Sequence, residues 1–440
     1  MKLINDDIIY IGVNDHQLDL FEGQYIVPNG MAYNSYVIRD ELIAVFDTVE
    51  EHFKNDWFNN LKEALGEDKP TYLIVQHMEP DHSGNLMEFL NEYPECFVVA
   101  TQNAFKMIKQ FYGKEISRKI IVSDGDSLNL GKHILKFILA PMVHWPEVMV
   151  TYDMTSKVLF SADAFGKFGA LDHEEDWACE ARRYYFGIVG KYGAQVQNLL
   201  RKTENFDIKA ICPLHGPVLN KDIDYYLNLY DTWSSYQSET DGVAIFYTSV
   251  YGHTKEAAEL LKDNLINKGC PKVAIADLAR EDMAECVEDA FRYPNIVFAT
   301  TTYNMSIFPF MKTFIDHLVE HNFQNKNVAF IENGTWAPNA IKVMKSLLEE
   351  AKNIVYIEPE VRILSSISPE NREEIAKLAD ELIKPTDFLA KSKTERQKTR
   401  KHHFACKICG FVLETEEDEL PKDFICPICK HPASDFEKID

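Results

Sequence analysis

Long apolar runs are missing from this 440-residue chain, and none approaches the ~18 consecutive residues that a membrane-spanning helix needs. A leader of basic and then apolar residues is also lacking, because the first four residues run directly into Asn5-Asp6-Asp7. We therefore expect a cytoplasmic protein with no membrane partner.

Positive charge is scarce. Lys and Arg number 46 against 69 Asp and Glu, which gives a net charge of −23 and disfavours nucleic acid as a partner. The exception is residues 389–403, where six basic residues stand against one acid, and we interpret this segment as a solvated linker. At about 150 residues a domain, the length predicts roughly three domains.

Cysteine is sparse for a disulfide-bonded protein. There are nine cysteines, and an odd number cannot all pair within the chain. A large cytosolic chain is also a poor candidate for a disulfide framework. Five are scattered and are expected to be small core residues: Cys96, Cys179, Cys212, Cys270 and Cys286. The other four form two Cys-x-x-Cys pairs near the C-terminus.

The order of apolar segments changes near residue 240. Residues 1–240 mix predicted strands at 32–38, 42–47, 72–75, 97–100, 134–138 and 148–152 with helices at 50–66, 103–112 and 190–202. Asp124-Gly125 and Gly131-Lys132 indicate hairpin turns. From Val243, strands at 243–247, 273–275, 296–299, 328–331 and 354–357 alternate with helices, which predicts a doubly wound parallel sheet.

The most informative segment follows the predicted strand 72–75. His77, Glu79, Asp81 and His82 place two imidazoles and two carboxylates on one short loop. Such ligands suit iron, zinc or manganese, and clustered buried carboxylates need a cation to neutralise them. Three further candidates follow apolar runs, next to Pro or Gly: His144, Asp163 and His215. A single His is usually an ordinary surface or core residue, but here residue type, order and loop context agree.

These seven residues resemble the ligand set of the metallo-β-lactamase-like fold in its flavodiiron variant, an αββα sandwich. Zinc hydrolases of that fold carry His where Glu79 stands, and the harder carboxylate favours iron. The resemblance implies His77, Glu79 and His144 on one iron, Asp81, His82 and His215 on the other, and Asp163 bridging both. Some family members carry His at the Glu22 position, so Glu22 or Tyr25 is expected to shape the substrate pocket differently.

A second site is predicted where the strand 243–247 meets the next helix. Hydroxyls and backbone N–H groups at a helix N-terminus attract anions, and this loop resembles the phosphate loop of flavodoxins. Two later loops at strand ends support an FMN site, although Ser/Thr-rich helix caps also occur without a ligand. The expected residues are Thr248, Ser249, Val250, Tyr251, Gly252, His253 and Thr254, then Thr301, Thr302, Tyr303 and Asn304, and finally Asn333, Gly334, Thr335 and Trp336.

The C-terminal pairs Cys406/Cys409 and Cys426/Cys429 predict a tetrahedral four-thiolate metal site. The surrounding residues resemble rubredoxin, with a spacing closer to that of the rubrerythrin tail. The resemblance implies one iron, and zinc remains the alternative. A module of this size needs the metal to hold it together.

Together the motifs resemble a flavodiiron protein with a C-terminal rubredoxin domain. We expect domains at 1–240, 241–388 and 404–440, joined by the linker 389–403. The resemblance implies reduction of dioxygen to water, or of nitric oxide to nitrous oxide, with electrons passing from the rubredoxin iron through FMN to the diiron site. A separate NAD(P)H-dependent rubredoxin reductase is the expected donor, and a head-to-tail homodimer or a dimer of dimers the expected assembly.

Two other functions fit parts of the sequence. One is a dimetal hydrolase of the metallo-β-lactamase type, in which metal-bound hydroxide attacks the substrate. The other is an electron carrier with an inert first domain. Glu79 and the flavin loops disfavour the hydrolase, and the complete set of seven ligands disfavours the carrier.

Overall fold

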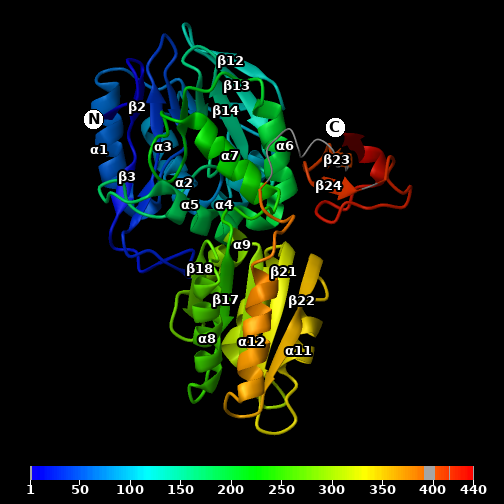
Figure 1. Cartoon of the computed structure of the whole chain (residues 1–440). Helices are drawn as coiled ribbons and strands as arrows, with labels where there is room; N and C mark the ends of the chain where they lie inside the picture. Colours follow the sequence, from blue (N-terminus) through cyan, green and yellow to red (C-terminus); the bar gives the residue numbers. More distant parts are fainter. Residues whose placement is uncertain (1, 391–401, 416, 440) are drawn as a thin grey trace. The chain divides into compact units, whose positions relative to one another are not determined.

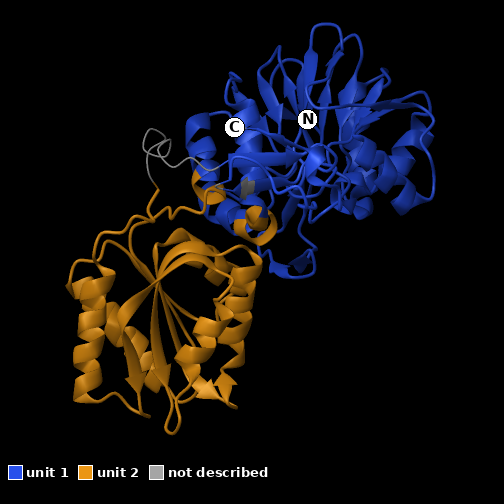
Figure 2. Cartoon of the chain, turned by 90° about the vertical axis from the view of Figure 1, so that its right-hand side faces the viewer, with its two compact units in different colours: residues 1–185, 192–231, 399–440 blue, residues 186–191, 232–398 orange. Residues whose placement is uncertain are grey.

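The computed structural model describes residues 2–390, 402–415 and 417–439 (Figure 1). Unit 1 comprises residues 1–185, 192–231 and 399–440, and unit 2 comprises residues 186–191 and 232–398 (Figure 2). Most of the expected linker 389–403 lies outside the described residues. Among the described helices, none has the length and apolarity needed to span a lipid bilayer.

Two sheets form the framework of unit 1. The first has the order β1 (Lys2–Leu3), β2 (Ile8–Tyr10), β7 (Tyr36–Ile38), β8 (Ala44–Phe46), β9 (Tyr72–Ile74), β10 (Phe97–Ala100) and β11 (Lys119–Ile121). The second has the order β12 (Ser127–Asn129), β13 (Ile134–Leu139), β14 (Met149–Asp153), β15 (Val158–Phe160) and β16 (Ala210–Cys212). Two small two-stranded sheets pair β3 (Val13–Asp15) with β6 (Met31–Tyr33) and β4 (Leu20–Phe21) with β5 (Tyr25–Ile26).

The core of unit 1 lies between these sheets. Strands β7 and β8 consist of aromatic, β-branched and small apolar residues, all of them buried. Phe46 of β8 stacks on Phe160 of β15 with ring centroids 4.0 Å apart. Since both rings are fully buried, this stack fastens one sheet to the other.

Helices cover the sheets from outside, with α1 on one side and α6 on the other in Figure 1. Their bounds are η1 (Glu51–Phe53), α1 (Lys54–Leu65), α2 (Pro80–Ser83), α3 (Leu86–Glu92), α4 (Gln102–Tyr112), α5 (Trp177–Tyr184), α6 (Gly193–Thr203) and α7 (Ile223–Ser234). The short helices η2 (Tyr185–Val189) and η3 (Gly190–Tyr192) contain residues 186–191, which belong to unit 2. Local signals set the ends of α4. The Thr101 hydroxyl accepts the N–H of Ala104, and Gly113 ends the helix at φ 65°.

Two local predictions need correction. The strand predicted at 32–38 is two strands, because Asn34 and Ser35 leave the ladder between β6 and β7. Asn34 Nδ2 instead donates to the carbonyls of Pro213 and Gly216, and so holds the loop that carries His215. The hairpin turn predicted at Asp124-Gly125 is wrong, since β11 and β12 belong to different sheets. The turn at Gly131-Lys132 is confirmed between the paired strands β12 and β13.

Unit 2 has the predicted parallel sheet, in the order β18 (Val273–Asp277), β17 (Val243–Tyr247), β19 (Asn295–Tyr303), β21 (Gln324–Asn333) and β22 (Lys352–Ile363), with β20 (Ser306–Ile307) paired to β19. Its helices are α8 (His253–Asn267), α9 (Met283–Arg292), α10 (Pro309–Glu320), α11 (Ala340–Leu347) and α12 (Pro369–Leu382). Helices lie on both faces of the sheet, as Figure 2 shows. Apolar residues of α8 and α12 pack on Val243, Ile245 and Val297 to form a core.

The C-terminal module has three strands in the order β24 (Val412–Thr415), β23 (His402–Cys406) and β25 (Phe436–Lys438), with the short helix η4 (Ala433–Asp435). Its described buried residues are three of the four cysteines together with Phe404, Ala405, Val412 and Phe436. Such a small apolar core makes the metal site part of what holds the module together.

Candidate functional site

The seven predicted metal ligands come from different loops and meet at one edge of the two sheets. His77 and Glu79 follow β9, and Asp81 and His82 lie in α2. His144 lies between β13 and β14, Asp163 follows β15 and His215 follows β16. The segment that carries the first four ligands requires glycine at position 84. A Cβ there would lie only 2.7 Å from the carbonyl oxygen of Pro80.

The side chains form two clusters of possible ligands. In the first, Glu79 Oε2 lies 3.2 Å from His77 Nε2 and 3.0 Å from His144 Nε2. Asp163 belongs to this cluster through Oδ2, which lies 3.1 Å from His144 Nε2. The second cluster contains Asp81, His82 and His215, with the two Nε2 atoms only 3.1 Å apart.

Asp163 lies between the clusters. Its Oδ2 faces the first, and its Oδ1 lies 3.2 Å from His82 Nε2 and 3.9 Å from His215 Nε2 in the second. A carboxylate with one oxygen toward each cluster has the arrangement needed to bridge two ions.

The chemistry of these side chains fits two cations. Ligand atoms bound to one ion at ~2.1 Å and at right angles lie about 3 Å apart, which matches the distances within each cluster. Asp81 and Asp163 have buried carboxylate oxygens that accept no hydrogen bond from the described residues. The three carboxylates in this buried site would repel one another without positive charge between them. The two imidazole nitrogens of His82 and His215, 3.1 Å apart, would likewise repel each other.

Two residues that the sequence analysis did not single out position the ligands. Glu147 is buried, and its Oε1 accepts hydrogen bonds from His77 Nδ1 and from the backbone N–H of Met78, both at 2.8 Å. Asp47 accepts the backbone N–H of Gln76 at 2.8 Å and that of His77 at 3.2 Å, and burial raises its pKa to about 6. On the second cluster, His215 Nδ1 donates to the carbonyl of Ala32. These bonds direct Nε2 of His77 and His215 toward the ion sites.

Aromatic rings and one carboxylate surround the clusters. Phe21 and Tyr184 lie 5.4 and 5.6 Å from the His215 ring. The Tyr184 hydroxyl is fully buried and has no hydrogen-bond partner among the described residues, and burial with the nearby carboxylates raises its pKa. Glu22 occupies the turn between β4 and β5 at φ 50°. Glu22 is exposed, and partial desolvation and then the charge of Glu79 raise its pKa to about 7.

The first flavin loop lies between β17 and α8. Thr248 is buried, and its hydroxyl lies 2.6 Å from that of Thr300 on the neighbouring strand β19. Ser249 Oγ accepts the N–H of Gly252, which precedes α8 at φ 95°. His253 is half exposed and lies 3.9 Å from Glu256, whereas Tyr251 is 91% exposed.

The two later loops join the first at the carboxyl edge of the sheet. Thr301 and Thr302, predicted to lie in a loop, are instead residues of β19, whose pairing with β21 continues to Thr301. Thr301 Oγ1 donates to the carbonyl of Asn333 at the end of β21, and Thr302 Oγ1 accepts the N–H of Asn339 in the loop after it. Gly334 donates its N–H to the carbonyl of Ile363. Tyr303 and Trp336 are exposed, Trp336 by 81%. The structure therefore gathers the three predicted loops, with aromatic side chains free to contact a planar ligand.

The four cysteines of the C-terminal module also meet. Their sulfurs lie within 4.8 Å of one another, with Cys406 and Cys429 at 3.5 Å and Cys409 and Cys426 at 3.5 Å. Both Cys-x-x-Cys turns use a left-handed residue, Gly410 at φ 72° and Lys430 at φ 61°. This is a complete four-thiolate site.

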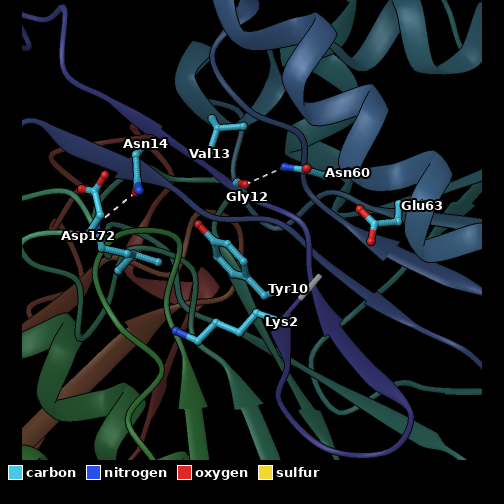
Figure 3. Close-up of a pocket in the computed structure, with 9 residues that line it drawn as sticks. Lys2, Tyr10, Gly12, Val13, Asn14, Asn60, Glu63 and Asp172 are labelled. Atoms are coloured by element: carbon cyan, nitrogen blue, oxygen red, sulfur yellow. Dashed lines mark hydrogen bonds between the residues drawn. The ribbon is translucent and has the colours of Figure 1, made fainter.

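A surface hollow of about 380 Å³ contains none of the predicted site residues (Figure 3). Tyr10 and Asn60 line it, and Asn60 Nδ2 donates to the carbonyl of Gly12.

Comparison with known proteins agrees with each module. Residues 31–216 match the model of the ODP family beta lactamase, residues 244–388 match a flavodoxin domain, and residues 404–437 match the rubredoxin-like domain of rubrerythrin. The last match confirms the predicted likeness to the rubrerythrin tail.

Relatives cover most of the chain. A nitric oxide reductase of Moorella thermoacetica is 32% identical over 367 residues, which are 81% of this chain and 91% of that protein. The anaerobic nitric oxide reductase flavorubredoxin of Escherichia coli K12 is 25% identical, over 99% of this chain and 98% of its own. The crystal structure of the flavodiiron protein from Giardia intestinalis is 25% identical with a TM-score of 0.81, and the match covers 86% of this chain and 95% of that one.

The predicted fold class and cofactor set are confirmed: a metallo-β-lactamase-like domain with a diiron site, a flavodoxin-like domain for FMN, and a rubredoxin-like domain whose four cysteines are arranged to bind a metal. The chain belongs to the flavodiiron proteins, in the form that carries a C-terminal rubredoxin-like domain.

Proposed function

We propose that this oxidoreductase reduces nitric oxide to nitrous oxide and water, and dioxygen to water, at the site formed by the seven clustered ligands. The balanced reactions are 2 NO + 2 e⁻ + 2 H⁺ to N₂O + H₂O, and O₂ + 4 e⁻ + 4 H⁺ to 2 H₂O. The names of the relatives from Moorella and Escherichia coli favour nitric oxide as the substrate.

The position of Asp163 carries the proposal. One carboxylate with an oxygen toward each cluster would hold two ions close enough for a small diatomic molecule to contact both. When bound, the irons supply Lewis acidity and electrons. The chain's own residues hold and orient them: Glu147 fixes His77, and the carbonyl of Ala32 fixes His215.

The ligand roles are part of the proposal. His77, Glu79 and His144 bind one iron, Asp81, His82 and His215 bind the other, and Asp163 bridges. The four cysteines bind a third iron, from which electrons pass to FMN in the loops after β17, β19 and β21. The domain boundaries at 240, 388 and 403 and the cytoplasmic location expected from the sequence stay predictions.

Exposed side chains at the flavin edge support a partner there. Tyr251, Met305 and Trp336 are all more than 80% exposed, an unusual state for large apolar residues. A flavin and the diiron domain of a second chain, placed head to tail, would cover them. We also propose that a separate NAD(P)H-dependent reductase supplies electrons to the rubredoxin-like domain.

Metal analysis and rapid-mixing kinetics test this function. The purified chain is expected to contain three irons and one FMN, and after chemical reduction it should be reoxidised rapidly by nitric oxide, by oxygen, or by both. A colourless, zinc-loaded chain with hydrolase activity would favour the hydrolase. An iron-loaded chain that neither gas reoxidises would be an electron carrier.

A further inference from the structure

Glu332 is a fully buried carboxylate at the carboxyl edge of the unit 2 sheet. It is the second-last residue of β21, and in the register of the sheet it lies between Thr300 of β19 and Arg362 of β22 (Figure 1). The third predicted flavin loop starts at the next residue, Asn333. An ionised carboxylate away from water is costly unless positive groups compensate it.

Two groups compensate the charge of Glu332. Its Oε1 accepts a hydrogen bond from Arg362 Nε at 2.5 Å, and its Oε2 accepts the backbone N–H of Ile341 at 3.0 Å. Ile341 lies in the first turn of α11, where the helix dipole is positive. Within the part of the chain that the structure describes, the side chain of Asn339 makes no capping bond to α11, so a strand residue caps this helix instead.

The capping bond closes the loop that carries the predicted flavin contacts. The loop leaves the sheet just after Glu332, and the Glu332 side chain holds Ile341, where the next helix starts. Shortly before that point, the Asn339 N–H donates to Thr302 Oγ1 on β19. The loop is thus fixed at both ends, while Trp336 in its middle stays 81% exposed.

The two charged partners differ in their access to water. The Glu332 side chain is 0% exposed, whereas the Arg362 side chain is 60% exposed. The residue after Arg362, Ile363, accepts the N–H of Gly334, so Arg362 also lies beside the flavin loop. The pair therefore places two opposite charges at the flavin edge, and water screens the positive one more strongly.

We propose that Glu332 is a positioning residue that holds the third flavin loop in place, and that Glu332 and Arg362 together set the potential at which FMN is reduced. This inference rests on the proposed function, in which FMN binds at these loops. Reduction adds electrons to the flavin, so a nearby carboxylate disfavours the reduced form and a nearby guanidinium favours it. In the wild-type chain the two charges oppose each other.

Removing each charge in turn tests the proposal in the full-length holoprotein. Glu332→Gln keeps an acceptor for the Ile341 N–H but loses the charge, so the FMN potential, measured by redox titration, should rise. Arg362→Gln leaves the carboxylate unopposed, so the potential should fall, by a smaller amount because water screens Arg362. The double variant should return toward the wild-type potential. A purely structural role of the pair would give shifts of the same sign or none.

The affinity for FMN provides a second readout. Each single variant breaks the bond between the two side chains and should weaken FMN binding about tenfold, as expected for the loss of one charge-assisted hydrogen bond. The double variant should weaken it by the same factor, because both substitutions break the same bond. The fluorescence of FMN released when the holoprotein is diluted measures this change.

Glu381→Gln and Lys384→Gln are the matched controls. These two side chains form an exposed ion pair at the C-terminal end of α12, outside the predicted flavin loops, so both variants should keep the wild-type potential and FMN affinity.

The sign of the shift in potential decides the outcome. Shifts of the same sign in Glu332→Gln and Arg362→Gln, or no shift in either, would overturn the proposal and leave the proposed gas reduction intact. Because Arg362 is exposed, its variant should fold, and a potential that does not fall in it would be sufficient to overturn the proposal. A wild-type chain that binds no FMN would overturn the proposed function as well.

Discussion

Glu147 accepts the N–H of His77 at 2.8 Å, and this bond turns the other ring nitrogen of His77 toward Glu79 and Asp163. A carboxylate in this position fixes the tautomer of the imidazole and strengthens it as a ligand. The first ion site therefore depends on a residue that touches no metal.

Replacing Glu147 tests this dependence. Glu147→Gln keeps an acceptor oxygen but loses the charge, whereas Glu147→Ala loses both, so iron affinity should fall ~10-fold in the first variant and ~100-fold in the second. Competition with a chelator, followed by metal analysis, measures the change. Glu115→Gln, an exposed residue paired with Lys109, serves as the control. Equal affinity in all three variants would contradict the role of Glu147.

Asp163→Asn would remove the proposed bridge between the two ions. An amide offers one good ligand oxygen in place of two, and it lacks the negative charge that two adjacent cations need. We expect the variant to hold at most one iron in this domain, to lose the magnetic coupling between the irons, and to lose gas reduction. Asp207→Asn, at an exposed ion pair, should retain both irons. An Asp163→Asn variant with two coupled irons would show that another group bridges them.

In the part of the chain that the structure describes, no group forms a hydrogen bond with the buried Tyr184 hydroxyl, so removing it should not destabilise the fold. Tyr184→Phe is expected to unfold at the wild-type temperature or slightly above it. If the hydroxyl contacts the bound gas or a proton on its way to it, turnover should fall while the metal content stays unchanged. Unchanged kcat and KM for both gases would mean that the hydroxyl only fills space.

Cys409→Ser should interrupt the proposed electron path before FMN and leave the step from FMN to the diiron site intact. A site with three thiolates cannot hold iron as four do, and the C-terminal module should lose its metal. Turnover driven by a rubredoxin reductase and NADH should fall to background, while turnover of chain whose FMN is reduced directly by light should persist. The Cys270→Ser variant is the control, since Cys270 belongs to none of the groups of potential metal ligands among the described residues. Normal reductase-driven turnover in Cys409→Ser would place the entry point elsewhere.

The stack of Phe46 on Phe160 gives a stability prediction. Phe46→Ala removes a fully buried ring from between the two sheets and should lower the free energy of unfolding by about 3–5 kcal/mol. Denaturant titration of the holoprotein measures this change. Phe111→Ala, at a position 49% exposed, should cost far less.

Residue type, order and loop context together were enough to predict which seven side chains the structure brings together, because the loops at one edge of a sandwich converge. The residues that position the ligands were missed because their contacts leave no local pattern in the sequence. Glu147 follows Trp145-Pro146 with no local sign of its contact with His77, 70 positions earlier. Asp124-Gly125 has the composition of a hairpin turn, but a dipeptide carries no information about which sheet receives the next strand. Asn34 and Ser35 interrupt a run of strand-forming residues because their side chains bond to distant backbone.

The seven ligands span residues 77–215 and come from the ends of four different strands and one short helix. Each bound ion thus cross-links parts of the chain that are far apart in sequence. Such a cross-link lowers the conformational entropy of the unfolded chain in the way that closing a loop does. Iron supply is accordingly expected to control how long the first domain survives heat and proteases, in addition to whether it can react with a gas.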